Sequence, residues 1–222
     1  LDDYPDVLHI AYHPSSPYST CIFSQHNPVE NDARTNYYGI YGGTPRVVVQ
    51  GTVIQPQNPL LMASQIEEKL GQAANYSVSV AQIQNTDQEA VVTIVIKKIG
   101  PSEAALNLYA VLVEKEINYS APNGETVHHD VFRKVLFDMP VSLLSIGDSV
   151  VLAGSYSIDD QWIANQMHVA VMLQDVSSKS ILQSATSELL SNPQSISDQQ
   201  FSVKNDLFLP NPAVNYISLN ST

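Results

Sequence analysis

Between Asn75 and Ser187 the sequence passes through a long series of alternating β-rich segments, and this pattern leaves few folds open. The strongest segments are residues 90–98, 106–119 and 167–175, with turn sequences such as Pro122-Asn123-Gly124 between them. About seven strands at this spacing are typical of an antiparallel β-sandwich of immunoglobulin-like type. We therefore predict a β-sandwich domain over residues 75–187. A helix at residues 140–145 is an alternative within this domain.

Residues 1–72 mix strand and helix signals and predict an α/β domain. In order, the pattern predicts a buried strand at residues 7–12, a helix that begins at Pro28, a β-hairpin at 46–55 and a second helix that begins at Pro59. Both helices begin with Asn-Pro, in which asparagine caps the helix and proline fits its first turn.

The end of the chain loses this periodicity. Residues 188–205 are predicted to be a linker, and residues 206–222 a short closing segment.

Charge and cysteine content exclude several classes of function. Ten basic residues oppose 22 acidic ones, which gives a net charge of -12 and argues against nonspecific binding to nucleic acid or to anionic membranes. No apolar run approaches the ~20 residues of a membrane-spanning helix. Cys21 is the single cysteine, so these residues hold no intrachain disulfide, CxxC pair or cysteine-rich zinc site.

Gly42-Gly43-Thr44-Pro45, followed by the β-rich residues 46–51, resembles the cis-proline loop and terminal hairpin of the thioredoxin fold. Together with residues 7–13 and 34–42, this order is similar to the thioredoxin-like half of the twenty-eight-kilodalton outer-membrane protein family of Bacteroidetes. Three β-rich segments extend the resemblance: residues 108–119, 129–136 and 169–176.

The resemblance implies a thioredoxin-like domain at residues 1–72, joined to the β-sandwich, and a secreted or outer-membrane location in a Gram-negative bacterium. It also implies that Thr44 and Pro45 would contact an extended peptide. In the family, the first strand lies in the sheet between the strands at residues 7–13 and 46–50, and it precedes both of them in sequence. This sequence contains no such strand before residue 7. Either that part of the chain is absent, or residues from elsewhere, such as a partner molecule, fill the position.

Residues 207–219 contain Pro-Asn-Pro-Ala before a β-rich run, which resembles the opening of a type IX secretion sorting domain. This resemblance implies the type IX secretion machinery as a partner. The alternative is an ordinary proline turn followed by a strand.

No catalytic, cofactor-binding or metal-ligating residue is predicted. In redox-active relatives the CxxC follows the missing first strand, and a buried structural role is favoured for the lone Cys21. His128 and His129 are adjacent on a predicted strand, so they point to opposite faces and are interpreted as solvent-facing residues rather than metal ligands. Asp159-Asp160 is interpreted as a turn rather than a calcium loop.

Aromatic residues offer one further hypothesis. Tyr37, Tyr38 and Tyr41 are candidates for a binding platform, although a core role is favoured for two of them at helical spacing. Trp162 is either exposed in a loop or packed into the sandwich.

The sequence thus favours an incomplete thioredoxin-like domain followed by an immunoglobulin-like β-sandwich, acting as a non-catalytic binding module for an unidentified surface ligand. The alternative is a thiol–disulfide oxidoreductase whose CxxC lies upstream of Leu1. Carbohydrate adhesion by the sandwich is a third and weaker hypothesis.

Overall fold

The computed structural model describes Tyr4 and residues 7–54, 59–70, 72–191 and 215–219. Strands predominate over helices in these residues. The elements, in chain order, are β1 (Leu8–Tyr12), α1 (Ile22–His26), α2 (Pro28–Tyr37), β2 (Arg46–Val49), β3 (Thr52–Val53), α3 (Pro59–Lys69), β4 (Tyr76–Thr86), β5 (Glu89–Lys98), β6 (Leu106–Asn118), β7 (Val127–Val141), β8 (Ser149–Ser157), the 3-10 turn η1 (Ala164–Gln166), β9 (Met167–Asp175), β10 (Ile181–Thr186) and β11 (Asn215–Leu219).

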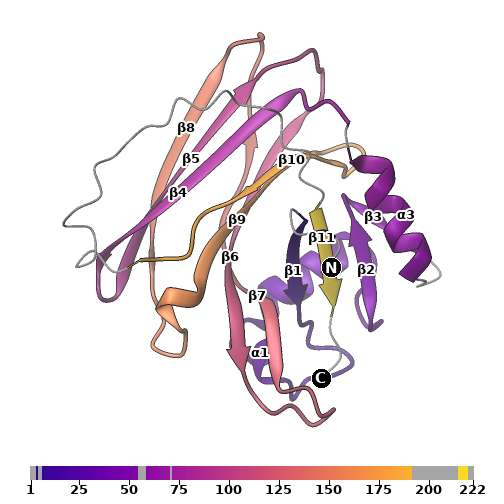
Figure 1. Ribbon diagram of the computed structural model, residues 1–222, viewed down its shortest axis with the longest axis vertical. Coiled ribbons are helices and arrows are strands. Elements are labelled where there is room, and N and C mark those ends of the chain that lie inside the picture. Colours follow the sequence, from indigo (N-terminus) through magenta and orange to yellow (C-terminus); the bar gives the residue numbers. More distant parts are fainter. Residues whose placement is uncertain (1–3, 5–6, 55–58, 71, 192–214, 220–222) are drawn as a thin grey trace.

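The strands form one large sheet and one small sheet (Figure 1). The large sheet has eight strands in the order β10-β9-β6-β7-β1-β11-β2-β3, and the small sheet has three in the order β4-β5-β8. Strand β1 runs parallel to both of its neighbours, β7 and β11, while the other pairs are antiparallel.

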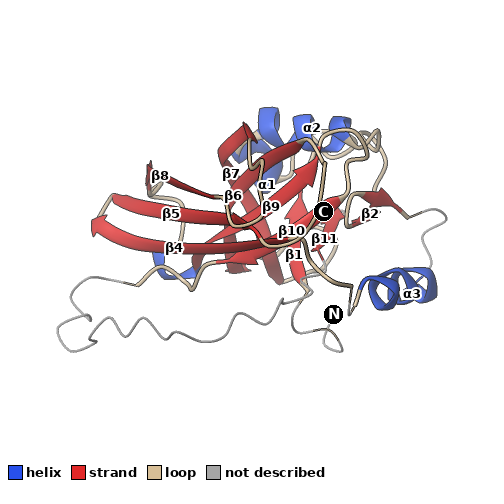
Figure 2. Ribbon diagram, turned by 90° about the horizontal axis from the view of Figure 1, so that it is seen from above, coloured by secondary structure: helices blue, strands red, loops and turns tan. Residues whose placement is uncertain are grey.

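The large sheet is covered on both faces. Figure 2 shows α1 and α2 on one side of it and α3 on the other. The small sheet packs against the β6–β9 part, so alternate residues of β6 enter different cores: Leu108 packs toward the small sheet and Tyr109 toward β1 and Tyr38. Because both of its faces are covered, β9 is buried along nearly its whole length, and its central run, residues 169–173, is entirely apolar.

The large sheet crosses the domain boundary that the sequence predicts near residues 72–75. Strands β6, β7, β9 and β10 come from the predicted sandwich, and β1, β2 and β3 from the predicted thioredoxin-like region, yet they share one sheet. The junction is narrow, since β1 pairs with β7 only at Ala11 and Val131. One hydrophobic core joins residues of both regions, including Tyr12 and Met172.

Several local predictions are confirmed. The Asn27 side chain accepts a hydrogen bond from the Glu30 backbone N–H at the start of α2. The hairpin between β2 and β3 turns at Gln50 and Gly51, whose φ angles of 46° and 87° suit a type I′ turn. A short loop at Asp159 forms the predicted turn, in which its carbonyl accepts a hydrogen bond from the Trp162 N–H.

Other local expectations differ from the structure. Residues 140–145 are not helical, because β7 continues to Val141 and a loop follows. The chain is still packed at Leu190, which is buried and donates its N–H to Met167 O, so the predicted linker does not begin at residue 188. Residues 206–214 lie outside the described residues, while residues 215–219 form the strand β11.

Among the described residues, none of the helices has the length and apolar character needed to span a bilayer.

Candidate functional site

A groove of about 500 Å³ opens where α2 crosses the ends of β6, β7 and β9. Its lining includes Glu30, Arg34, Tyr37, Tyr109, Asp138 and Gln174. These residues come from one helix and three strands that lie far apart in the sequence. The groove exists because α2 packs across the large sheet, where Arg34 contacts Tyr109 of β6 and Gln174 of β9.

Arg34 forms the floor of this groove and is held in a cage of aromatic rings. Its guanidinium carbon lies 3.9 Å from the ring centre of Tyr109, 4.8 Å from that of Tyr38 and 5.2 Å from that of Tyr37. Its Nη2 donates to Tyr38 Oη at 3.0 Å, and its Nη1 to Gln174 Oε1 at 3.4 Å. Cation–π contacts of this kind are worth more when the cation is desolvated.

The charge of Arg34 is retained in this cage. Burial disfavours the guanidinium, but the surrounding tyrosines, with Tyr38 the strongest, raise the Arg34 pKa. Burial also disfavours the charged form of Tyr109, which raises its pKa to about 12, so its hydroxyl stays protonated at neutral pH. The floor is therefore a buried positive charge enclosed by aromatic rings, with only 6% of Arg34 exposed.

The rim of the groove carries carboxylates. Asp138 is exposed, and its Oδ1 accepts a hydrogen bond from Asn107 Nδ2 at 2.7 Å. Glu30 has a structural role, because its Oε2 accepts from Asn27 Nδ2 at 2.5 Å and from the Val135 N–H at 2.8 Å. Asp138 is thus the rim carboxylate that is open to a ligand.

The predicted tyrosine platform is only partly assembled. Tyr38 is buried in the core, Tyr37 lines the groove with 37% of its surface exposed, and Tyr41 lies elsewhere, with its hydroxyl 3.1 Å from Ser15 Oγ. Lys179 Nζ lies 4.5 Å from the Tyr37 ring centre. Tyr109 was not identified from the sequence, because no local sequence pattern indicates that β6 packs against α2.

The Thr44–Pro45 peptide bond is cis, and the pair precedes β2 on the surface, with Thr44 partly exposed and Pro45 exposed. The neighbouring Arg46 begins β2 and pairs with Leu219 of β11. The loop therefore lies beside the end of an extended strand; its predicted role in peptide binding stays a prediction.

Cys21 is buried, as the sequence favoured, and its Sγ lies 3.8 Å from His13 Nδ1. Burial, with His128 and Arg133 nearby, lowers the pKa of His13 to about 3. His13 is thus neutral at physiological pH and packs against the Phe23 ring.

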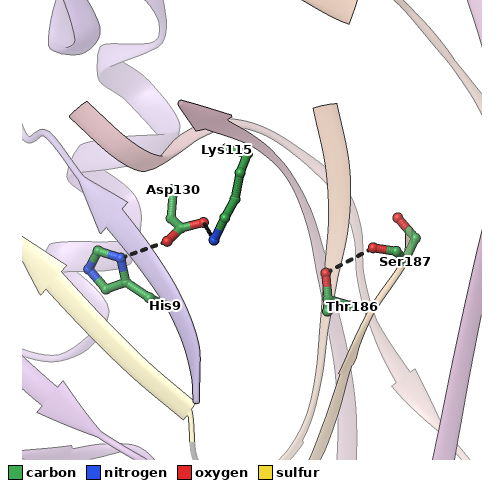
Figure 3. Close-up of polar contacts among 5 residues, drawn as sticks. All are labelled: His9, Lys115, Asp130, Thr186 and Ser187. Carbon is green, nitrogen blue, oxygen red and sulfur yellow. Dashed lines mark hydrogen bonds and ion pairs between the residues drawn. The ribbon is translucent and has the colours of Figure 1, made fainter. Parts of the chain in front are cut away.

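A second polar cluster joins three strands of the large sheet (Figure 3). Asp130 of β7 lies 3.1 Å from His9 Nδ1 of β1 and 2.8 Å from Lys115 Nζ of β6. Burial opposes ionisation of Asp130, but the hydrogen bonds from His9 and Lys115 outweigh it and lower the Asp130 pKa. The same view draws Thr186 and Ser187 as a separate pair, in which the Thr186 hydroxyl donates to Ser187 O.

The interpretation of His128 as solvent-facing is wrong. His128 is fully buried, with its Nε2 3.0 Å from Tyr119 O, and its ring packs edge-on against Phe23. His129 alone faces solvent. The error arises because the alternation of side chains along a strand requires His128 and His129 to point to opposite faces, but it does not determine which face α1 covers.

Within the described ranges, no group of three or more His, Cys, Asp or Glu residues is placed to hold a metal ion. Trp162 is partly buried against the core beneath the small sheet, and its Nε1–H donates to His26 Nε2 at 2.9 Å. Of the two alternatives for this residue, packing into the sandwich is the one observed.

Comparison with known proteins gives a likeness of fold. No family model matches the chain, and no curated protein matches it either. Among solved structures, HBP35 of Porphyromonas gingivalis is similar, with a TM-score of 0.63 and 15% identity over 85% of this chain. The chain spans 65% of the length of that protein. A domain of the outer membrane lipoprotein Omp28 from P. gingivalis aligns with 55% of this chain and 93% of its own, at 10% identity and a TM-score of 0.37.

Proposed function

We propose that this chain is a secreted or outer-membrane-associated surface protein that acts as a non-catalytic binding module on a thioredoxin-like scaffold with an immunoglobulin-like β-sandwich. The order of motifs that resembles the Bacteroidetes outer-membrane family supports this location, together with the likeness of fold to HBP35 of P. gingivalis. The arrangement of β1, β2, β3 and α3 supports a thioredoxin-like half, and the packing of the small sheet on β6 and β9 supports a sandwich.

The observation that carries the binding role is the groove beside α2. Its floor is rigid, because Arg34 is fixed by three rings and two hydrogen bonds. Its rim offers the Asp138 carboxylate and the half-exposed Tyr37 ring, within a molecule whose net charge is -12. Because the Arg34 charge lies beneath the rings and is almost inaccessible, the charge that a ligand meets at the rim is that of Asp138. The rim therefore favours a ligand with basic and apolar groups, and we infer a short peptide segment of that composition.

The test is binding of the full chain to an array of short basic, neutral and acidic peptides at low and physiological salt. An exposed charge pair is worth about 1 kcal/mol, so Asp138→Asn should weaken binding of basic peptides about fivefold. Asp160→Asn removes the same charge from an exposed turn outside the groove and serves as the matched control. Equal binding by both variants, or a preference for acidic peptides, contradicts the proposed groove.

The surface location is tested separately by protease treatment of intact cells that produce the full protein. Degradation of the protein at the surface, with a periplasmic marker left intact, supports the proposal. Protection of both proteins contradicts it.

We also propose that residues 206–222 begin a type IX sorting segment and so contact the type IX secretion machinery. Its support is the Pro-Asn-Pro-Ala sequence at residues 210–213. Surface display that is unchanged after Pro210 and Pro212 are both replaced by alanine contradicts this role.

The alternative function is thiol–disulfide exchange with a CxxC outside these residues, in which Thr44 and Pro45 contact the substrate peptide. An insulin-reduction assay on the full-length mature protein distinguishes the two. Turnover that disappears when upstream cysteines are replaced by serine would establish the enzyme and remove the non-catalytic proposal.

A further inference from the structure

Two adjoining hollows surround the loop that follows β8. One, of about 280 Å³, is lined by residues of α1, α2, β7 and this loop, and the other, of about 400 Å³, by the loop and the turn between β4 and β5. Ser157 and Asp159 line both hollows, so the two form one continuous trough. The trough shares only Glu30 with the groove beside α2, and it is therefore a different site.

Trp162 supplies the aromatic surface of the trough and is held in a fixed position. Its ring packs against the core beneath the small sheet, and its Nε1–H donates to His26 Nε2 at 2.9 Å. An indole N–H can only donate, so the neutral His26 ring carries its own proton on Nδ1. The Trp162 backbone N–H donates to Asp159 O at 3.0 Å, which ties the ring to the turn beside it. The ring is thus presented to the trough without a loose side chain that a ligand would have to order.

The charges around this ring are of both signs. The hollow that contains Trp162 is lined by two carboxylates, of Glu30 and Asp159, and by two cations, of Arg133 and Lys134. One of the cations is already paired, since Arg133 Nη2 lies 2.6 Å from the Glu114 carboxylate. A lining of this kind does not select a ligand that carries a strong charge of either sign.

The neighbouring hollow offers polar groups that accept and donate hydrogen bonds. Asp160 and Gln161 are exposed there, and Asp159 Oδ1 accepts from the Gln161 N–H at 2.9 Å, which fixes the turn. An ionised carboxylate accepts through both oxygens, and an amide side chain both donates and accepts. These groups suit a ligand that presents several hydroxyl groups side by side.

A sugar unit has both of the surfaces that this trough complements. The C–H groups on one face of its ring pack against an aromatic side chain, and the hydroxyl groups at its edge donate and accept hydrogen bonds. We propose that the trough between α1, β8 and the β4–β5 turn binds a neutral oligosaccharide, with Trp162 packed against one sugar ring and Asp159 and Asp160 accepting from its hydroxyl groups. This site does not depend on the peptide ligand of the groove.

Intrinsic fluorescence of the full chain tests the site directly, because Trp162 is the only tryptophan. The probes are neutral oligosaccharides of glucose, mannose, galactose, xylose and N-acetylglucosamine, together with an acidic galacturonate oligomer and a basic chitosan oligomer. We expect a saturable change in the tryptophan emission with at least one neutral sugar and a weaker response to both charged oligomers. The absence of a saturable change with every neutral sugar, or stronger binding of a charged oligomer, overturns the proposal.

A blocking substitution locates the bound sugar. Ser157 is exposed and lies where the two hollows meet, so Ser157→Tyr should fill the trough and weaken binding at least about tenfold in calorimetry. Ser155→Tyr is the matched control, because Ser155 is exposed on the same side of β8 but is not among the residues of the trough. Equal affinity in these two variants, each shown to be folded by circular dichroism, overturns the location.

A second pair of variants separates the trough from the groove. Asp160→Asn keeps the size of the side chain and removes its charge, so it should weaken sugar binding about fivefold, whereas Asp138→Asn should leave sugar binding unchanged. Equal sugar affinity in the two variants overturns the role of Asp160. Because the readout is sugar binding alone, a failure of the proposed peptide ligand does not affect this result.

Discussion

Mild acid should destabilise this protein through two buried histidines. His13 is 2% exposed and His168 is 5% exposed, and burial is the main cause that lowers their pKa values to about 3 and about 4. In the unfolded chain a histidine has a pKa of about 6.5. Between these values the unfolded state binds protons that the folded state does not, so stability falls as the pH decreases through 6.5.

The magnitude follows from the unfolded pKa alone as long as the folded state stays neutral. At pH 5 each unfolded histidine lies about 1.5 units below its pKa, which is worth about 2 kcal/mol per histidine. A domain of ordinary stability has ~5–15 kcal/mol in total, so the two histidines together remove a large share of it. Asp130, whose pKa is lowered, loses its contribution only in a more acidic range, below the pKa of an ordinary aspartate.

The assay is urea denaturation followed by far-UV circular dichroism at pH 7.5, 6 and 5. His168→Gln and His13→Gln should each reduce the pH dependence by about 2 kcal/mol between pH 7.5 and 5. His129→Gln, which changes an exposed histidine of β7, is the control for the effect of the substitution itself. Stability that is constant or higher at pH 5, or a dependence that neither buried variant reduces, refutes the reasoning.

Two further predictions concern a buried ion pair and a tight turn. Glu114 is fully buried, and its Oε2 accepts hydrogen bonds from Arg133 Nε and Nη2 at 2.7 and 2.6 Å. Glu114→Gln leaves the buried Arg133 cation without a counter-charge, so it should lower the free energy of unfolding in chemical denaturation by about 3–5 kcal/mol. A decrease below about 1 kcal/mol contradicts this. Gly51 has a φ of 87°, and an added Cβ would meet Lys179 O at 1.9 Å, whereas Gly124 has a similar φ of 91° and open space around it. Gly51→Ala should therefore lower the melting temperature clearly more than Gly124→Ala, and equal effects would show that the close approach to Lys179 is unimportant.

Much of the local structure follows from short stretches of sequence. Asn27 and Pro28 mark the start of α2 because a cap and a fixed φ act within a few residues. Gly51 marks the hairpin because few residues accept a positive φ. The alternating segments of the second half become β5, β6 and β9 near their predicted bounds, since side-chain alternation depends only on the strand itself.

The candidate site was not predictable in the same way. In the sequence, Arg34 has no feature that distinguishes it from other polar helix residues. Its contact with Tyr109 of β6 depends on how α2 crosses the sheet. The burial of the Glu114–Arg133 pair depends on the register between β6 and β7, which shifts twice along the pair. Such contacts join residues far apart in sequence, and periodicity carries no information about register between distant strands.

The sequence and the large sheet give different expectations about whether the chain has two independent domains, and one calorimetric measurement distinguishes them. Composition changes near residue 72, and two independent domains would unfold in two transitions. The large sheet instead carries strands from both sides of that point, and one core contains Tyr12 and Val48 together with Val111 and Met172. Because those side chains lose their packing together, we expect a single calorimetric transition, with the van't Hoff enthalpy equal to the calorimetric one. Two resolved transitions would mean that the junction through Ala11 is too narrow to couple the halves, and that each half is stable by itself.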